Sequence, residues 1–196
     1  MTRQHHFITG GQRSGKSRHA ERLAMKWLAE VPGRSVTVVA TAQASDDEMQ
    51  QRIERHRQDR PAAFKTHEEP LHLGAAVRAL SEADRLLLVD CLTLWWTQVV
   101  FKGRGSKSED HAAAAMTDND AADAFREDLL AALTEAPGPV ILISNEIGSG
   151  VIPTGAEVRA FVDDMGRLNQ AVAQRCGVIT WMVAGQAFTQ AVEQTS

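Results

Sequence analysis

The hydrophobic positions of the chain form short continuous apolar runs that alternate with longer stretches at helical spacing. Runs typical of buried strands lie at 7–9, 35–41, 63–66, 85–90, 140–144 and 178–184. Amphipathic stretches that predict helices lie at 17–28, 45–58, 71–80, 92–100, 121–133 and 156–175. Strands and helices in alternation predict an α/β fold, with a mainly parallel sheet covered on both faces. The length and the lack of a repeat or linker predict one domain over 1–196.

Two segments carry local signals beyond this alternation. Ser45 is expected to cap the helix at 45–58, because Glu48 follows three residues later and completes a capping box. Residues 103–120 combine Gly-Arg-Gly-Ser, mixed charges and an alanine run, which predicts a surface excursion. The run at 178–184 is expected to be the last strand.

Residues 10–17 read GGQRSGKS and fit the phosphate-binding loop pattern G-x-x-x-x-G-K-S. The motif stands between a predicted strand and a predicted helix, which is the context it requires. Its glycines let backbone N–H groups point at phosphates, Lys16 adds a positive charge, and the Ser17 hydroxyl is a magnesium ligand. We therefore expect nucleotide binding at Gly10, Gly11, Gln12, Arg13, Ser14, Gly15, Lys16 and Ser17.

Two acidic residues follow predicted strands, at the sheet edge where open α/β folds bind ligands. Asp90 ends the run at 85–90 and is expected to hold Mg²⁺ beside Ser17; the alternative is a cap for the next helix. Glu146 follows the run at 140–144. It is expected to activate a hydroxyl or order the metal, and a loop acid paired with an arginine is an equally good interpretation.

His56 lies in a predicted helix on the same face as Met49 and Ile53. A histidine on such a face is more often packed in a core than catalytic. Two features favour a role in catalysis: a neutral imidazole is a competent nucleophile, and several guanidinium groups nearby suit a polyphosphate. The arginines within four positions are Arg52, Arg55, Arg57 and Arg60.

The overall composition narrows the possible partners. The formal net charge is -4, which gives no general attraction to nucleic acid or anionic membranes. Cys91 and Cys176 show no metal or CxxC spacing, so free thiols in a reducing cytoplasm are expected. The first residues are polar and no apolar run approaches the length of a membrane span. We expect a cytoplasmic protein that neither binds nucleic acid nor inserts into membranes.

Taken together, these motifs resemble the bifunctional adenosylcobinamide kinase / adenosylcobinamide-phosphate guanylyltransferase family of cobalamin biosynthesis. The resemblance covers nearly the whole chain, and its later segments are more specific than the phosphate loop alone. It is carried by ITGGQRSGKSRHAE at 8–21, ATAQ at 40–43, DDEM at 46–49, RI at 52–53 with His56, RP at 60–61, DCLT at 90–93, NEIGSGVIP at 145–153 and GRLNQ at 166–170.

The resemblance implies two reactions on a RecA-like, three-layer phosphate-loop fold. ATP or GTP phosphorylates the aminopropanol hydroxyl of adenosylcobinamide, and GTP then transfers GMP through a histidine to adenosylcobinamide phosphate. The product is adenosylcobinamide-GDP, and the protein is expected to be a homo-oligomer, a trimer. The guanylylated histidine falls on His56. Further nucleotide contacts fall on Thr41, Ala42, Gln43, Arg57, Gln58, Asp59, Arg60, Glu68 and Asp90.

The chain departs from the family pattern at two of these positions. Relatives often carry two adjacent histidines where this chain has Arg55-His56, so His56 is the only nucleophile expected. Asp90 stands where glutamate is frequent, which keeps the charge. Three other functions stay open at this point. They are a simple small-molecule kinase without a covalent intermediate, a RecA-like ATPase acting on nucleic acid, and a guanine-nucleotide switch, the last without an Asn-Lys-x-Asp motif.

Overall fold

The computed structural model describes residues 5–44, 46–102 and 118–192. Their strands form one sheet in the order β3-β2-β4-β5-β1-β6-β7. Neighbouring strands are parallel from β3 to β6, and only β7 is antiparallel to its neighbour β6. The mainly parallel sheet is therefore confirmed. The strands are β1 (His6–Gly10), β2 (Ser35–Ala40), β3 (Phe64–Glu68), β4 (Arg85–Asp90), β5 (Val140–Ile143), β6 (Val178–Val183) and β7 (Gln186–Ala191).

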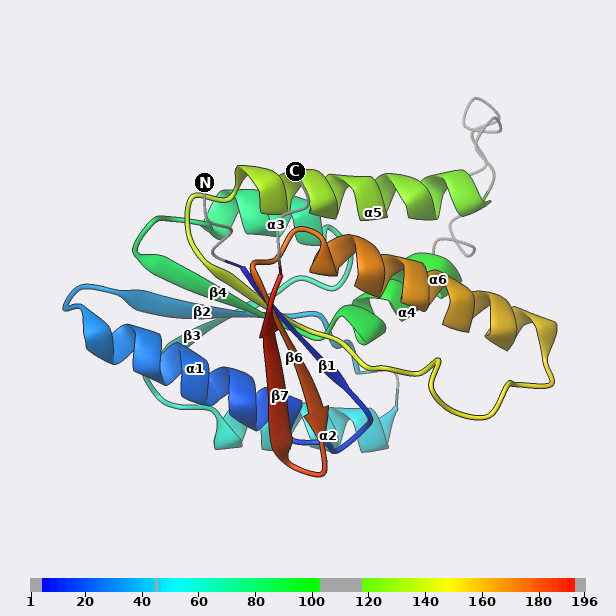
Figure 1. Cartoon of the computed structure of the whole chain (residues 1–196), viewed down its shortest axis with the longest axis horizontal. Coiled ribbons are helices and arrows are strands. Elements are labelled where there is room, and N and C mark those ends of the chain that lie inside the picture. Colours follow the sequence, from blue (N-terminus) through cyan, green and yellow to red (C-terminus); the bar gives the residue numbers. More distant parts are fainter. Residues whose placement is uncertain (1–4, 45, 103–117, 193–196) are drawn as a thin grey trace.

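Helices cover both faces of this sheet, as Figure 1 shows. In β4, Leu86 and Leu88 pack with α1 on one face, whereas Leu87 and Val89 pack under α3 to α6 on the other. A strand buried on both faces reads as a continuous apolar run, which explains the sequence pattern. The three-layer α/β architecture is confirmed. The helices are α1 (Lys16–Glu30), α2 (Asp47–Asp59), α3 (Leu73–Leu80), α4 (Leu92–Lys102), α5 (Asp118–Glu135) and α6 (Ala156–Ala173).

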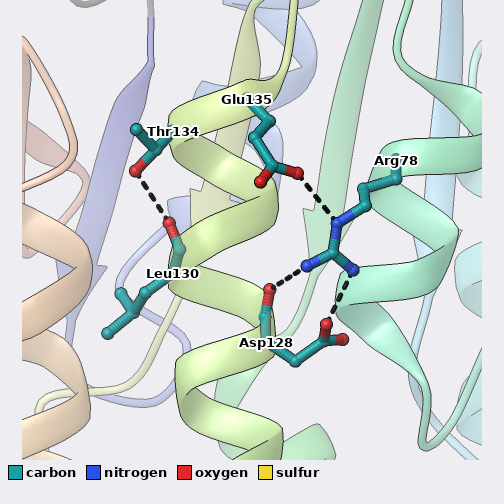
Figure 2. A network of polar contacts seen from close by, with 5 residues as sticks. All are labelled: Arg78, Asp128, Leu130, Thr134 and Glu135. Atoms are coloured by element: carbon teal, nitrogen blue, oxygen red, sulfur yellow. Dashed lines mark hydrogen bonds and ion pairs between the residues drawn. The ribbon is translucent and has the colours of Figure 1, made fainter.

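A polar network fixes α3 against α5 at the outer layer (Figure 2). The Arg78 guanidinium donates Nε to Glu135 Oε2 at 3.0 Å and Nη2 to the Asp128 carbonyl oxygen at 3.1 Å. Its Nη1 also lies 2.7 Å from Asp128 Oδ1. Beside it, Thr134 Oγ1 donates to the carbonyl oxygen of Leu130. These exposed contacts orient two helices whose stability comes mainly from the apolar side chains beneath them.

The predicted cap of α2 is corrected by one residue. Asp46 is the N-cap, and its Oδ1 accepts a hydrogen bond from the Met49 backbone N at 2.8 Å. The proposed capping box of Ser45 and Glu48 is therefore wrong, and Ser45 itself lies outside the described residues. Serine and aspartate are equally good caps, so two adjacent ones cannot be told apart by composition.

Two further boundaries differ from the expectation. Most of the predicted surface excursion, 103–117, lies outside the described residues, but Asp118 to Asp120 form the first turn of α5. Acidic residues suit a helix N-terminus, which explains this earlier start. After β6, the positive φ angles of Ala184 and Gly185 close a two-residue hairpin into β7, so β6 is not the last strand.

His6 in β1 is expected to make folding stability depend on pH. Its Nε2 lies 2.7 Å from Thr180 Oγ1, and burial lowers the pKa of His6 to about 4, with a further contribution from His19. Because this folded-state pKa is below the ordinary 6.5, the unfolded chain takes up the proton first. The contribution of His6 to the free energy of unfolding is therefore fully present above pH 6.5 and is lost as the pH falls toward 4.

The variant His6→Gln keeps a hydrogen-bonding group but cannot titrate. We expect its melting temperature to fall less between pH 7 and pH 5 than that of the wild type, as measured by calorimetry. Equal falls in the two proteins would show that His6 does not couple to folding.

Candidate active site

The phosphate loop joins the end of β1 to the start of α1. Its backbone turns through positive φ angles at Gly10 (151°), Arg13 (56°) and Gly15 (97°). A Cβ atom at Gly10 would lie 2.4 Å from the carbonyl oxygen of Met182 in β6. The glycine at the start of the motif is therefore required both by its dihedral angle and by the close approach of β6.

The side chains of this loop are arranged for an anion. Lys16 is 8% exposed, and its Nζ donates to the carbonyl oxygens of Gly10 at 2.9 Å and Gly11 at 2.7 Å. Ser14 Oγ is buried, and no described residue is its hydrogen-bond partner. Since buried hydroxyls are normally paired, this one is suited to a phosphate oxygen. The N-terminus of α1 begins at Lys16 and adds its positive dipole end to the same place.

Two other segments of the chain form backbone hydrogen bonds with the loop. The Gly185 backbone N, in the turn between β6 and β7, donates to the Ser14 carbonyl oxygen at 3.1 Å. The Glu146 backbone N, just after β5, donates to the Gly10 carbonyl oxygen at 3.1 Å. The loop conformation is thus set by contacts from distant parts of the chain as well as by its own glycines.

A cavity of about 350 Å³ opens at the carboxyl edge of the sheet above this loop. It brings together the loop, the end of β4 and one face of α2, which are far apart in the sequence. Its lining residues are Gln12, Arg13, Ser14, Gly15, Lys16, Ser17, Arg18, Ala40, Ala42, Met49, Ile53, His56, Arg57, Arg60, Glu68, Asp90, Cys91, Leu94, Ile143 and Asn145.

His56 faces this cavity from α2. Met49, Ile53 and His56 all line it, so the predicted shared face of the helix is confirmed. His56 is half-buried and lines the cavity, so its ring is not enclosed in a core. Its catalytic role stays a prediction. Among the described residues, none forms a hydrogen bond with its imidazole ring.

Two of the arginines near His56, Arg57 and Arg60, are paired with acids of the same cavity. Arg60 Nη2 lies 3.6 Å from Asp90 Oδ2, and these side chains are only 12% and 20% exposed. Arg57 forms an ion pair with Glu68 of β3. Burial, followed by the charge of Asp90, raises the pKa of Glu21 on α1. Arg60 therefore lies among acidic groups, and a polyphosphate in the cavity would compete with them for its guanidinium.

The cavity also holds donors that fit a magnesium ion. The Ser17 hydroxyl and the Asp90 carboxylate both line it. Hydroxyl and carboxylate oxygens are the hard ligands that Mg²⁺ prefers, and Mg²⁺ usually takes only one or two protein ligands together with phosphates. The donor set thus agrees with the predicted metal role of these two residues.

Comparison with known proteins identifies the family. Residues 6–189 match the family described as cobinamide kinase / cobinamide phosphate guanyltransferase. The chain belongs to this family. It is 48% identical to the bifunctional adenosylcobalamin biosynthesis protein CobP of Pseudomonas aeruginosa, over 91% of this chain and 92% of the relative. It is 36% identical to the bifunctional adenosylcobalamin biosynthesis protein CobU of Escherichia coli and to that of Salmonella typhimurium, in each case over 91% of this chain and 95% of the relative.

Several predicted site residues do not line the cavity. Thr41 is fully buried, where its Oγ1 donates to the Cys91 carbonyl oxygen and accepts from the Cys91 backbone N. Glu146 is half-buried next to Asn145, and its Oε1 accepts from the Gly148 backbone N at 3.2 Å. The nucleotide contact of Thr41 and the catalytic role of Glu146 stay predictions. So do the nucleotide contacts of the other predicted residues outside the cavity lining, which are Gly10, Gly11, Gln43, Gln58 and Asp59.

The structure adds residues that sequence reasoning missed. Asn169 of α6 donates Nδ2 to the Asn145 carbonyl oxygen at 3.2 Å and accepts from Ser144 Oγ at 2.7 Å. Thr93 Oγ1 accepts from the Asn145 backbone N at 2.9 Å. Together they hold Asn145 at the cavity wall. The segment GRLNQ marked Asn169 as a family feature, but no local pattern indicated which residue it contacts.

No helix among residues 5–44, 46–102 and 118–192 has the length and apolar character to cross a membrane.

Proposed function

We propose that this protein phosphorylates adenosylcobinamide with ATP or GTP and then transfers GMP from GTP, through His56, to adenosylcobinamide phosphate. The final product is adenosylcobinamide-GDP. One observation carries the proposal: the phosphate loop and His56 line the same cavity, so a bound triphosphate has both within reach. Membership of a family described by both activities supports it.

In the kinase step, the loop holds the triphosphate and the aminopropanol hydroxyl attacks the γ-phosphorus. The bond from the γ-phosphorus to the bridging oxygen breaks, and the nucleoside diphosphate leaves. Lys16 and the loop N–H groups stabilise the charge on the phosphate oxygens, which is the main contribution a protein makes to such a transfer. The Glu146 carboxylate, next in sequence to cavity-lining Asn145, is our proposed acceptor of the hydroxyl proton.

In the guanylyl step, a neutral imidazole nitrogen of His56 attacks the α-phosphorus of GTP. A nitrogen–phosphorus bond forms, the bond to the β-phosphate oxygen breaks, and pyrophosphate leaves. A phosphate oxygen of adenosylcobinamide phosphate then attacks the same phosphorus and releases the histidine. Arg57 and Arg60 line the cavity with His56 and would stabilise charge in both displacements. The covalent intermediate divides one difficult transfer into two easier ones.

Ser17 and Asp90 would hold a magnesium ion, which would neutralise charge on the phosphates. Asp90 is paired with Arg60 in this structure. With Asp90 as a metal ligand, the Arg60 guanidinium would be available to the nucleotide phosphates. Ser17, Asp90 and the phosphate loop would therefore serve both reactions, which differ in the nucleophile and in the phosphorus atom that is attacked.

The proposal is tested by supplying the purified protein with adenosylcobinamide, Mg²⁺ and ATP, and then with GTP. Mass spectrometry is expected to detect adenosylcobinamide phosphate after the first addition and adenosylcobinamide-GDP after the second. A product that stops at the phosphate would favour the single-activity kinase. No product in either stage would contradict the proposed function.

A further inference from the structure

The loop between β5 and α6 exposes two large apolar side chains. Val151 is 95% exposed and Ile152 is 78% exposed, more than the other exposed large hydrophobic side chains in the described ranges. Scattered apolar residues on a surface are ordinary, but two adjacent ones that are almost fully exposed indicate a contact with something outside the chain. Neither residue lines the nucleotide cavity.

Hydrogen bonds at both ends give this loop a defined shape. At its start, the Asn145 and Glu146 backbone N atoms donate to Thr93 Oγ1 and to the Gly10 carbonyl oxygen. At its end, Arg159 Nη1 donates to the carbonyl oxygens of Pro153 at 3.0 Å and Thr154 at 2.6 Å. Because the loop is anchored at both ends, it loses less conformational entropy when a partner binds.

The loop is continuous with the reaction site. It begins at Asn145, which lines the cavity, and it is tied directly to the first glycine of the phosphate loop. In Figure 1 it leaves the end of β5 and runs outward, away from the sheet, to the start of α6. A molecule that reaches from the cavity along this loop would therefore meet Val151 and Ile152.

The size of the cavity indicates which molecule this is. A volume of about 350 Å³ lies at the low end of the range for sites of drug-sized ligands. A corrinoid is a much larger macrocycle whose rim carries methyl groups and amide side chains. It must stay outside the cavity and reach in only with its aminopropanol arm.

We propose that Val151 and Ile152 form the apolar contact for the corrinoid macrocycle, which positions its aminopropanol arm at the nucleotide. This inference rests on the proposed function. Two adjacent apolar side chains suit the methyl-bearing rim of one macrocycle, whereas a stable protein interface buries about 1,200 Å² or more. Contact with a second copy of the chain is the alternative that the experiment separates.

The test is the double variant Val151→Ser with Ile152→Thr, assayed at saturating nucleotide. We expect KM for adenosylcobinamide to rise about tenfold or more, the scale of losing apolar groups from a binding contact. The affinity for GTP and the labelling of the protein by GTP are expected to stay at wild-type values, because neither uses the corrinoid. The matched control is Val31→Ser, an exposed valine at the far end of α1, which is expected to leave KM unchanged.

A second variant keeps the test decisive if the polar pair distorts the loop. Val151→Ile with Ile152→Val conserves apolar volume and is expected to keep the wild-type KM. The inference is overturned if the polar pair leaves KM unchanged, if the apolar swap raises KM as much as the polar pair does, or if light scattering shows that the polar pair changes the oligomeric state while KM stays constant. In each of these cases the wild type still turns over adenosylcobinamide, whereas a wild type without turnover would contradict the proposed function itself.

Discussion

The variant His56→Ala is expected to lose covalent labelling by α-phosphate-labelled GTP and to lose formation of adenosylcobinamide-GDP. The physical reason is that the nucleophile is removed from the cavity wall while the phosphate loop is left unchanged. Phosphorylation of adenosylcobinamide needs no covalent intermediate, so it should continue at close to the wild-type rate. The measurement is retention of label on a denaturing gel, alongside a kinase assay of the same preparation.

The stability of the label identifies the residue type. A bond between phosphorus and a histidine nitrogen is acid-labile and alkali-stable, so the wild-type label should disappear in acid and survive in base. His67→Ala is the matched control, since His67 is exposed on β3 and does not line the cavity. A label that persists in His56→Ala, or a kinase activity that falls as far as the guanylyl transfer in a folded protein, would contradict the role assigned to His56.

The sequence predicted most of the site because its signals are local. The glycine spacing of the phosphate loop follows from dihedral angles that only a few residues tolerate, and helical spacing placed Met49, Ile53 and His56 on one face. The carboxyl ends of parallel strands meet at one sheet edge, which is why Asp90 could be expected near the loop. The structure places Gly15, Met49, Ile53, His56 and Asp90 around one cavity.

The parts that the sequence could not predict depend on contacts between distant segments. All the side chains of β7 are exposed, so its sequence has no alternation of buried apolar and exposed polar residues. The strand pairs with β6 through its backbone. The ion pair of Arg60 with Asp90 joins residues 30 positions apart (90 − 60). The position of Glu21 in the same charged group is likewise visible only once α1 and β4 are packed together.

The bracing of the phosphate loop explains why these distant contacts matter for function. Gly185 holds Ser14 from one side and Glu146 holds Gly10 from the other. Each contact comes from a segment whose own sequence signals only a turn or a loop. A preorganised anion site stabilises the charge of the transition state more than a flexible one does, because its dipoles need no rearrangement during the reaction. The fold thus supplies rigidity that the motif alone does not encode.

The variant Lys16→Met is expected to lose both activities together, in contrast to His56→Ala. Lys16 supplies the buried positive charge at the phosphate loop, and the loop is the part of the cavity that both reactions share. Removing one preorganised group that stabilises developing charge typically lowers the rate about 10²–10³-fold. We expect losses of roughly that size in kcat/KM for the kinase step and for labelling by GTP.

Methionine matches the lysine side chain as far as Cε, so the substitution removes mainly the ammonium group with its charge and its hydrogen bonds to Gly10 and Gly11. Lys26→Met is the matched control, because Lys26 is exposed on the same helix, ten positions further along (26 − 16). Thermal melting of both variants shows whether the fold is intact. If Lys16→Met loses the kinase step but is still labelled at His56 with wild-type efficiency, the guanylyl step does not use the phosphate loop, and the shared cavity cannot be the basis of both reactions.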